Sequence, residues 1–230
     1  MCYVDGRWGR TYFIGKDQYV GASLANYGEY NPDETEMILS LASGRCLDIG
    51  ANFGVIGQAL ESVGHLVEYF EPQRDIVRFV LSKNVNGRIH NTAVGRLPGT
   101  TTMPYVSFGS RANYGGLGCG SGSVSVPVTT IDSFGYDDVG FMKIDVEGFE
   151  EEVLHGASET IARCNPIMYI EDDRIEKSAS LRALIKNMGY SIEEHKPTLY
   201  REDNYFGLRS NVWAPYNFAS HNLICRYVGS

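Results

Sequence analysis

Residues 45–54 read RCLDIGANFG, and this stretch decides the fold class. An apolar strand that runs into a glycine-rich turn is how α/β proteins present backbone N–H groups to a ligand. A nicotinamide or flavin fingerprint requires the spacing G-x-G-x-x-G. Counted from Gly50, the two other glycine positions hold Asn52 and Val55. The turn therefore does not match a dinucleotide fingerprint, and an NAD-dependent enzyme is disfavoured.

A carboxylate ends the next predicted strand. Residues 66–72 read LVEYFEP, and Glu71 follows Asp48 by 23 positions. An acidic residue about 20 positions after the glycine turn is placed to accept hydrogen bonds from two ribose hydroxyls. By itself, Glu71 would be read as a solvated residue at the end of a strand. Together with Asp48 and Gly50, it predicts a cofactor that contains a nucleoside.

Length and composition predict one α/β domain with an acidic surface. The chain has 230 residues, and 43% of them are hydrophobic, so that it can bury one sizeable core. Its formal net charge is −8 and its pI is near 5.1. Such a surface repels a phosphate backbone unless a local basic patch overrides the mean. We expect a single domain over residues 1–230, and we disfavour nucleic acid as its substrate.

The cysteines and the hydropathy pattern indicate the compartment. No C-x-x-C pair occurs, and an odd number of cysteines suits reduced thiols better than a disulfide framework or a zinc site. The five cysteines are Cys2, Cys46, Cys119, Cys164 and Cys225. No stretch approaches the length needed to span a membrane, and the N-terminus carries charges in place of an apolar run. We expect a cytoplasmic protein without a membrane partner, and the sequence leaves its oligomeric state open.

Helices and strands alternate along the chain. A helix is predicted over residues 31–44, where Asn31 is a suitable N-cap and Glu34 completes a capping box. A second helix is predicted over residues 55–63, and a third ends near Gly87. Alternating strands and helices with short connections imply a mostly parallel central sheet with helices on both faces. Ligands then bind at the carboxyl ends of the strands.

A third strand is predicted near residues 88–94. We expect its exit to lie beside the glycine turn, where Asn91 or the neighbouring backbone would meet the base of the cofactor. The alternative is that Asn91 only forms a turn.

Residues 96–127 differ in composition from the rest of the chain. Residues 114–123 read YGGLGCGSGS, and so many glycines make regular structure costly in backbone entropy. We interpret this insert as a mobile loop, which is either a lid over the acceptor or a plain surface hairpin.

The most specific pattern lies within residues 126–157. Its centre, FMKIDVEG (141–148), is an apolar strand that runs into acid-x-acid-glycine. A helix follows whose first turn holds three glutamates, where acids complement the helix dipole. Four other motifs accompany this one, and the five motifs in chain order are LDIGANFG (47–54), FEP (70–72), NTAVG (91–95), TIDSF (130–134) and KIDVEGFE (143–150). Over roughly residues 28–172, the chain resembles the FkbM family of methyltransferases.

This resemblance implies a fold, a cofactor and a reaction. The fold would be the Rossmann-like fold of class I methyltransferases, and the cofactor would be S-adenosylmethionine, with S-adenosylhomocysteine as product. The acceptor would be a hydroxyl on a sugar, a glycan or a secondary-metabolite scaffold. Asp48 would face the ammonium group of the cofactor and Glu71 its ribose. The cofactor-binding residues carried over are Asp48, Gly50, Asn52, Gly54, Glu71, Asn91 and Ala93.

The resemblance places Asp145 at the reaction centre, with Glu147 close behind it. Glu171 ends the neighbouring strand within residues 166–173, so that it would join Asp145 at the mouth of the site. One carboxylate would take the hydroxyl proton as the methyl group transfers. Asp145 can instead be read as a helix N-cap. His195 is a further candidate base, because imidazole titrates near neutral pH, although a surface histidine explains it as well.

Two other functions stay open. Carboxylates at the ends of adjacent strands suit Mg²⁺ or Ca²⁺, and metal-dependent sugar O-methyltransferases such as the macrocin O-methyltransferase family resemble this arrangement. The ligands would be Asp145, Glu171 and Asp172, although the full motif of that family is absent. A degenerate fold that binds the cofactor only as a sensor or scaffold is the alternative of another class.

The C-terminal third indicates structure more than chemistry. An apolar stripe over residues 181–188 predicts a helix, and residues 221–228 read as a final strand, which we expect to be antiparallel. Residues 196–220 form an aromatic-rich loop that either stacks on a ring-shaped acceptor or covers the edge of the sheet. Its aromatic residues are Tyr200, Tyr205, Phe206, Trp213, Tyr216 and Phe218.

Overall fold

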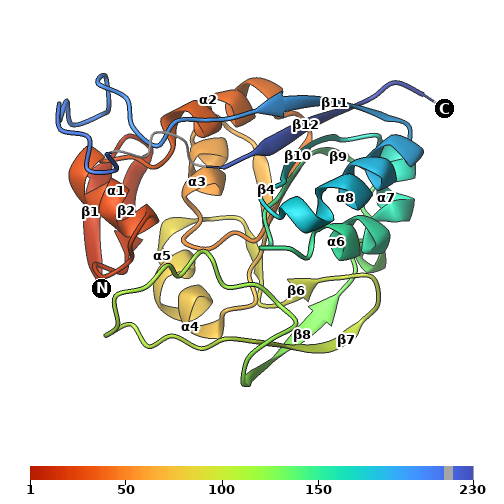
Figure 1. Cartoon of the computed structure of the whole chain (residues 1–230), viewed down its shortest axis with the longest axis horizontal. Helices are drawn as coiled ribbons and strands as arrows, with labels where there is room; N and C mark the ends of the chain where they lie inside the picture. The colour runs from red at the N-terminus through yellow and green to blue at the C-terminus, as the bar shows by residue number, and fades with distance from the viewer. Residues whose placement is uncertain (215–219, 230) are drawn as a thin grey trace.

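A computed structural model describes residues 1–214 and 220–229 (Figure 1). Its centre is a seven-stranded sheet in the order β11-β12-β10-β9-β3-β4-β5. β12 is antiparallel to both of its neighbours, and the other central strands run parallel to one another. The strands are β3 (Arg45–Ile49), β4 (Leu66–Phe70), β5 (Arg88–His90), β9 (Val139–Ile144), β10 (Ile167–Glu171), β11 (Tyr190–His195) and β12 (Asn222–Tyr227). The predicted α/β class with an antiparallel C-terminal strand is confirmed.

Successive strand residues point to opposite faces of the sheet, and each face is covered by its own helices. Leu47 and Met142 pack in the cluster that includes α6 (Glu150–Gly156), α7 (Ser158–Cys164) and α8 (Ile175–Asn187). Their sequence neighbours Cys46 and Phe141 pack in the opposite cluster. That cluster contains residues of α2 (Pro32–Leu41) and α3 (Val55–Ser62). It also contains Leu81 from the helical segment that ends in α5 (Ser82–Asn84). Figure 1 shows the two helical layers on either side of the sheet.

The predicted helices are present, with small differences at their ends. α2 begins at Pro32 after Asn31, which has the left-handed φ of 45°. Asn31 does not cap the helix with its side chain, and its amide nitrogen donates to the Glu34 carboxylate instead. The third predicted helix is continuous from Arg74 to Asn84, but its middle turn is a π-helix, so that the run consists of α4 (Arg74–Ile76), η1 (Val77–Leu81) and α5.

The prediction of one strand over residues 88–94 is wrong. β5 ends at His90 and lies at the edge of the central sheet, where β4 separates it from β3. β6 (Ala93–Val94) instead pairs with β8 (Val124–Thr129), which also pairs with β7 (Gly99–Met103). The residues that follow β5 nevertheless reach the edge of the sheet where β3 ends, because Thr92, Ala93 and Gly50 line one cavity. The chain changes sheet because it kinks at residues 91–92 between the two ladders.

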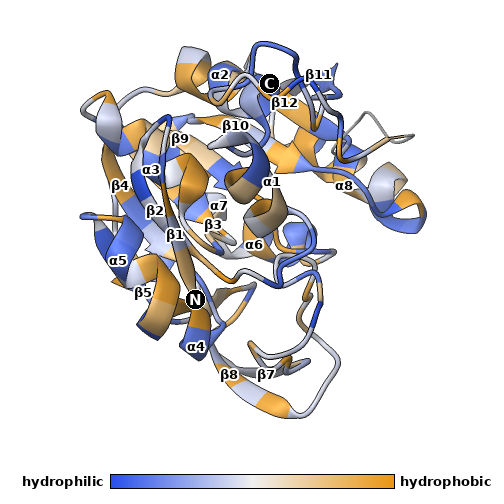
Figure 2. Ribbon diagram, turned by 90° about the vertical axis from the view of Figure 1, so that its left-hand side faces the viewer, coloured by the Kyte–Doolittle hydropathy of each residue, from blue (hydrophilic) through white to orange (hydrophobic). Residues whose placement is uncertain are grey.

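The glycine-rich insert forms a hairpin with a long loop. Its strands β7 and β8 extend below the main sheet in both Figure 1 and Figure 2, as the hairpin reading predicted. Residues 104–123 connect these strands without a helix or strand of their own. Tyr114 anchors this loop: its side chain is fully buried and its backbone N donates to Asp17 Oδ2 at 3.0 Å. The loop is thereby attached to the N-terminal part of the chain.

The N-terminal part of the chain adds elements that were not predicted. β1 (Cys2–Gly6) and β2 (Gly9–Phe13) form an antiparallel hairpin, and α1 (Val20–Tyr27) follows it. A third apolar cluster joins this region to the glycine turn and to the long loop through Phe53 and Tyr114. A single 3₁₀ turn, η2 (Asp132–Phe134), precedes β9. All five cysteines are free, as expected.

Candidate active site

A cavity of about 540 Å³ lies at the carboxyl ends of the central strands. β3, β4, β9 and β10 end at this edge, and each delivers polar residues to it. The position follows the rule that open α/β sheets bind ligands at the carboxyl ends of their strands. Most charged residues of the described lining are acidic, and they are Glu34, Asp48, Glu71, Asp145, Glu147, Glu171 and Asp173.

The glycine turn after β3 is held against two neighbouring strands. The N–H groups of Gly50 and Ala51 donate to Phe70 O at 2.9 and 3.1 Å, and Asp145 N donates to Ile49 O at 3.0 Å. Gly50 has a φ of +86°, and a Cβ at this position would lie 1.8 Å from Asp145 O. Both its conformation and its surroundings therefore require glycine. This close crossing sets the cofactor turn directly beside the end of β9.

Asp48 is a buried carboxylate whose hydrogen-bonding capacity is unused. Its side chain is 1% exposed, and neither oxygen has a hydrogen-bond partner of standard geometry among the described residues. The nearest cation is Lys143, whose Nζ lies 3.9 Å from Oδ1. Burial raises the pKa of Asp48. Because buried polar groups are nearly always hydrogen-bonded, these oxygens indicate a missing donor.

Glu71 holds the other side of the turn. Its Oε2 accepts a hydrogen bond from Asn52 N and its Oε1 accepts one from Gln73 N, each at 2.8 Å. The residue is 3% exposed, and burial raises its pKa to about 7. Asn52 has a φ of +48°, and its buried Oδ1 has no partner among the described residues. Glu71 therefore shapes the turn and still has lone pairs that face the cavity.

The remaining predicted cofactor residues differ in their placement. Ala93 lines the cavity. Gly54 does not line it, but it starts α3 with a φ of +79°, where a Cβ would lie 2.5 Å from Leu81 Cδ1. Asn91 lies outside the cavity lining, and its Nδ2 donates to Glu71 O at 2.9 Å. Asn91 thus stabilises the backbone that follows β4. Its position outside the cavity does not support the expected contact with adenine.

Three carboxylates lie together where β9 and β10 end. Asp145, Glu147 and Glu171 each offer an oxygen, and these three atoms lie within 4.8 Å of one another. Burial, and then the negative charge of Asp145, raise the pKa of Glu147 to about 7 and that of Glu171 well above its ordinary value. Lys143 Nζ lies 3.0 Å from Asp145 Oδ2. Arg174 pairs with Glu147, whose φ of +58° is unusual for a residue with a side chain.

The structure corrects two interpretations of the sequence. Asp145 does not cap the following helix, because α6 begins at Glu150 with Phe149 at its N-cap. Asp172 is not part of the acidic group, since its Oδ2 accepts from Ser178 Oγ and Arg182 Nε, each at 2.8 Å, and it does not line the cavity. Successive residues of an extended chain point to opposite faces, so that Asp172, which directly follows β10, is turned away from Glu171.

His195 also lies away from the cavity. Its Nδ1 is 2.8 Å from Tyr169 Oη on β10, and burial lowers its pKa. The structure therefore does not bring this histidine to the site.

Sequence reasoning missed several residues of the cavity. Lys143 interrupts an apolar strand, and a buried charge at such a position is a signal that could have been read. Glu34 had been assigned to a capping box, but it is 6% exposed and faces the cavity, and burial raises its pKa to about 7. Gly115 and Gly118 of the long loop pass close to the site: added Cβ atoms would lie 2.7 Å from Asn52 Nδ2 and 2.6 Å from Glu147 O. The sequence allowed the glycine-rich insert to be a lid, but it did not single out Asn52 and Glu147 as the residues that this loop approaches.

Comparison with known proteins assigns the family. The model of the methyltransferase FkbM domain matches residues 48–192, which contain the glycine turn and all three carboxylates of the acidic group. The chain belongs to the FkbM methyltransferase family. This confirms the resemblance seen in the sequence. A search of curated proteins found no match to the chain.

Solved structures show the same fold. The FkbM methyltransferase from Methylobacillus flagellatus KT is 18% identical, with a TM-score of 0.50 over 79% of this chain. The chain spans only 43% of the length of that protein. The precorrin-6Y C5,15-methyltransferase from Geobacter metallireducens GS-15 is 10% identical, with a TM-score of 0.50 over 86% of this chain and 87% of its own. The fold is thus the Rossmann-like fold of class I methyltransferases.

The residues of this FkbM methyltransferase fit its cofactor, S-adenosylmethionine. The unpartnered oxygens of Asp48 and Asn52 are acceptors without donors, and the cofactor carries an ammonium group and hydroxyls that are donors. Glu71 lies across the turn from Asp48 and also faces the cavity. When bound, the cofactor supplies a methyl group on a sulfonium.

No described helix is long and apolar enough to cross a membrane.

Proposed function

We propose that this enzyme methylates a hydroxyl group on a sugar, a glycan or a secondary-metabolite scaffold. The observation that carries the proposal is the group of three carboxylates, Asp145, Glu147 and Glu171, beside the cofactor turn. An O-directed transfer forms a bond between oxygen and the methyl carbon and breaks the bond between carbon and sulfur, and the hydroxyl must lose its proton. A carboxylate in this group would accept that proton.

The acidic group suits a proton acceptor that works near neutral pH. The pKa of Glu147 is raised to about 7 because the side chain is buried next to other acids. A base is most effective when its pKa lies near the operating pH. Lys143 lies 3.0 Å from Asp145 and would keep that carboxylate in place. Alignment of the acceptor with the methyl group would supply much of the remaining rate enhancement.

A metal-dependent version of the same reaction has its own support. The oxygens of Asp145, Glu147 and Glu171 lie close enough to share one divalent ion, and carboxylates are the ligands that Mg²⁺ and Ca²⁺ prefer. Glu147 thus replaces Asp172 in the set that we expected from the sequence. A bound ion would lower the pKa of the acceptor hydroxyl and position it. Arg174 already neutralises part of the charge of Glu147, which weakens this version.

The charge of the cavity also limits the acceptor. Lys143 is the one lysine or arginine among the described residues that line it, against seven carboxylates. A polyanion would be repelled at such an opening, so a small molecule or glycan is favoured over nucleic acid.

Methyl transfer from radiolabelled S-adenosylmethionine to pooled hydroxyl-bearing acceptors tests the proposal. We expect label in an ether that resists alkaline hydrolysis, which removes methyl esters. Label that enters only amines, carboxylates or nucleic acid would contradict it. The reaction is run with and without EDTA, followed by addition of Mg²⁺ or Ca²⁺. Loss of activity in EDTA with recovery by metal supports the metal-dependent version, and unchanged activity supports direct proton transfer.

A further inference from the structure

Among its described residues, the aromatic-rich loop contributes one ring to the cavity. Tyr200 packs on Tyr27, with ring centroids 5.5 Å apart, and Tyr205 is 53% exposed. Trp213, by contrast, lines the cavity. Phe206 is 46% exposed. Two further rings of this loop, Tyr216 and Phe218, lie outside the described residues.

Trp213 stacks on a ring from the other end of the chain. The centroids of Trp213 and Tyr19 are 5.6 Å apart, and the planes are inclined by 17°. Both residues line the cavity. The indole Nε1 of Trp213 is buried and has no hydrogen-bond acceptor among residues 1–214 and 220–229. A buried indole N–H normally has a partner, so this donor is suited to an oxygen of a bound molecule.

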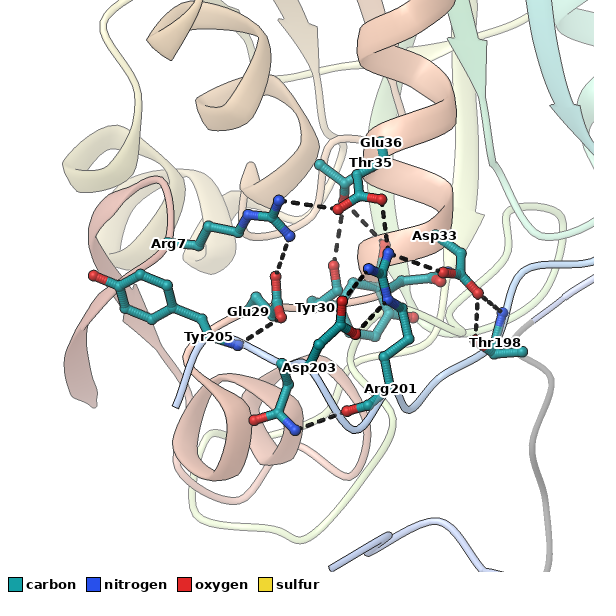
Figure 3. A network of polar contacts seen from close by, with 12 residues as sticks. Arg7, Glu29, Tyr30, Asp33, Thr35, Glu36, Thr198, Arg201, Asp203 and Tyr205 are labelled. Atoms are coloured by element: carbon teal, nitrogen blue, oxygen red, sulfur yellow. Dashed lines mark hydrogen bonds and ion pairs between the residues drawn. The ribbon is translucent and has the colours of Figure 1, made fainter. Parts of the chain in front are cut away.

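A network of ion pairs holds this segment in place (Figure 3). Arg201 Nη1 lies 3.3 Å from Asp33 Oδ1 and 2.6 Å from Glu36 Oε2, both on α2. Arg201 also pairs with Asp203 at 2.6 Å. Thr198 donates to the Asp33 carboxylate from its backbone N at 3.1 Å. We call these contacts the Arg201 clamp.

Further contacts attach the segment to the N-terminal elements. Arg7 pairs with Glu29 at 3.0 Å and with Glu36 at 2.9 Å, and Glu29 accepts a hydrogen bond from Tyr205 N at 2.8 Å. Val212 N donates to Tyr27 Oη at 2.7 Å, one residue before Trp213. The position of the indole is thus set by α1, α2 and the clamp together.

We propose that Tyr19 and Trp213 form the platform on which the acceptor stacks, and that this acceptor is a polyhydroxylated ring without anionic groups, such as a neutral or amino sugar. The inference rests on the proposed function. An aromatic pair beside a hydrogen-bond donor suits a ring that has one apolar face and hydroxyls at its rim. The negative charge that Asp145 brings to the same cavity would repel a uronic acid or a phosphorylated sugar. Arg201 is then a positioning residue.

Fluorescence can report on this platform directly, because the chain contains only two tryptophans, Trp8 and Trp213. In a Trp8→Phe protein saturated with S-adenosylhomocysteine, emission comes from Trp213 alone. Methyl glucoside, methyl glucosaminide and methyl glucuronide are titrated as probes at millimolar concentrations. We expect a saturable change in emission with the neutral and amino sugars and none with the uronide. A response to the uronide that equals or exceeds the others would overturn the charge assignment.

Two matched pairs of variants test the residues. Tyr19→Ala should weaken probe binding by about three- to tenfold. Tyr205→Ala removes an exposed ring of the aromatic-rich loop and should not weaken it. Arg201→Ala should weaken it by a similar factor and Arg201→Lys by less, whereas Arg209→Ala removes an exposed charge and should have no effect. The affinity for S-adenosylhomocysteine should stay within twofold in all five variants. An equal loss of cofactor affinity in Tyr19→Ala and Arg201→Ala would mean general structural damage and would overturn the assignment.

The outcomes also separate this inference from the proposed function. If label from the cofactor enters a hydroxyl of an acceptor that leaves Trp213 emission unchanged, the platform is wrong and the O-methyltransferase proposal stands. If the sugars bind at Trp213 but only amines or carboxylates are methylated, the platform stands as a binding site and the proposed reaction is wrong. Neither label nor a change in emission with any hydroxyl-bearing probe would contradict both.

Discussion

Gly50 and Asp145 approach so closely that a Cβ on Gly50 would lie 1.8 Å from the carbonyl oxygen of Asp145. Gly50 belongs to the turn that lines the cavity and is proposed to face the cofactor, and Asp145 begins the acidic group proposed to face the acceptor. The two ends of the reaction are thus coupled through a backbone contact between β3 and β9. A shift of either strand end would change the distance between the cofactor and the acceptor.

Gly50→Ala should destabilise the fold more than a comparable change elsewhere. The added methyl group would meet backbone and also impose strain at φ +86°, at a cost of about 3 kcal/mol or more. Gly64→Ala is the control, because Gly64 has a φ of +94° and open space around its Cβ position, so that strain of about 1 kcal/mol remains. Urea unfolding measures both. Equal destabilisation would show that the crossing with Asp145 relaxes at little cost.

Glu71→Ala should weaken cofactor binding. The change removes acceptors for the ribose hydroxyls and two hydrogen bonds that shape the turn, so we expect a loss of about 1.5 to 3 kcal/mol. Calorimetric titration with S-adenosylhomocysteine provides the measurement. Glu159→Ala removes an exposed glutamate of α7 and serves as the control. Undiminished affinity in Glu71→Ala would reject the assignment.

The cofactor-free protein should become less stable as pH rises from about 4.5 to about 7. Burial raises the pKa values of Glu34 and Glu71 in the folded protein from 4.5 to about 7. As the pH rises, these carboxyl groups therefore lose their protons in the unfolded chain before they do so in the folded protein, and the free energy of unfolding decreases over this interval. The stabilising contribution is complete below pH 4.5 and is lost by about pH 7. Thermal unfolding across this range should show a smaller decrease in Glu34→Gln than in the wild type. An identical pH dependence in both proteins would contradict the role of Glu34.

Asp145→Asn should reduce turnover and leave cofactor binding nearly intact. The amide keeps the shape of the side chain but cannot accept a proton or bind a cation well, so we expect a decrease of roughly 10²-fold or more in kcat. Asp137→Asn changes an exposed aspartate and is the matched control. Wild-type turnover in Asp145→Asn would show that Asp145 is not the proton acceptor and would leave Glu147 or Glu171 in that role.

The glycine-rich loop should become more ordered when ligands bind. Amide hydrogen exchange within residues 115–120 should slow when S-adenosylhomocysteine and an acceptor are both present, because this part of the loop borders the cavity. The amide of Tyr114 should already be protected in the free protein, since it donates to Asp17 in the interior. Complete protection of residues 115–120 without ligands would show that the loop is permanently ordered and is not a lid.

The sequence by itself determined the fold class, the family and the cofactor turn. The glycine turn at residues 45–54 and the acid at Glu71 are local patterns, and their chemistry can be read because each depends on a few neighbouring residues. The alternation of helices and strands was sufficient to predict a mostly parallel sheet, and the strand ends placed Asp145 and Glu171 at one edge. The close approach of Asp145 and Glu171 follows from the register of β9 and β10, in which Ile170 pairs with Ile144. The resemblance to the family had already placed Glu147 beside them.

Only the tertiary structure decided which residues face the cavity. Asp172 follows Glu171 directly in the chain, yet the alternation of side chains along the strand turns it to Arg182 on the opposite face. Trp213, Glu34 and the glycine-rich loop reach the cavity from distant parts of the chain. The composition of the two loops offered such contacts only as one of two alternatives, and the capping-box pattern around Glu34 did not predict its contact with the cavity. Long-range approach depends on the packing of whole elements, so these residues became part of the site only when the fold brought them together.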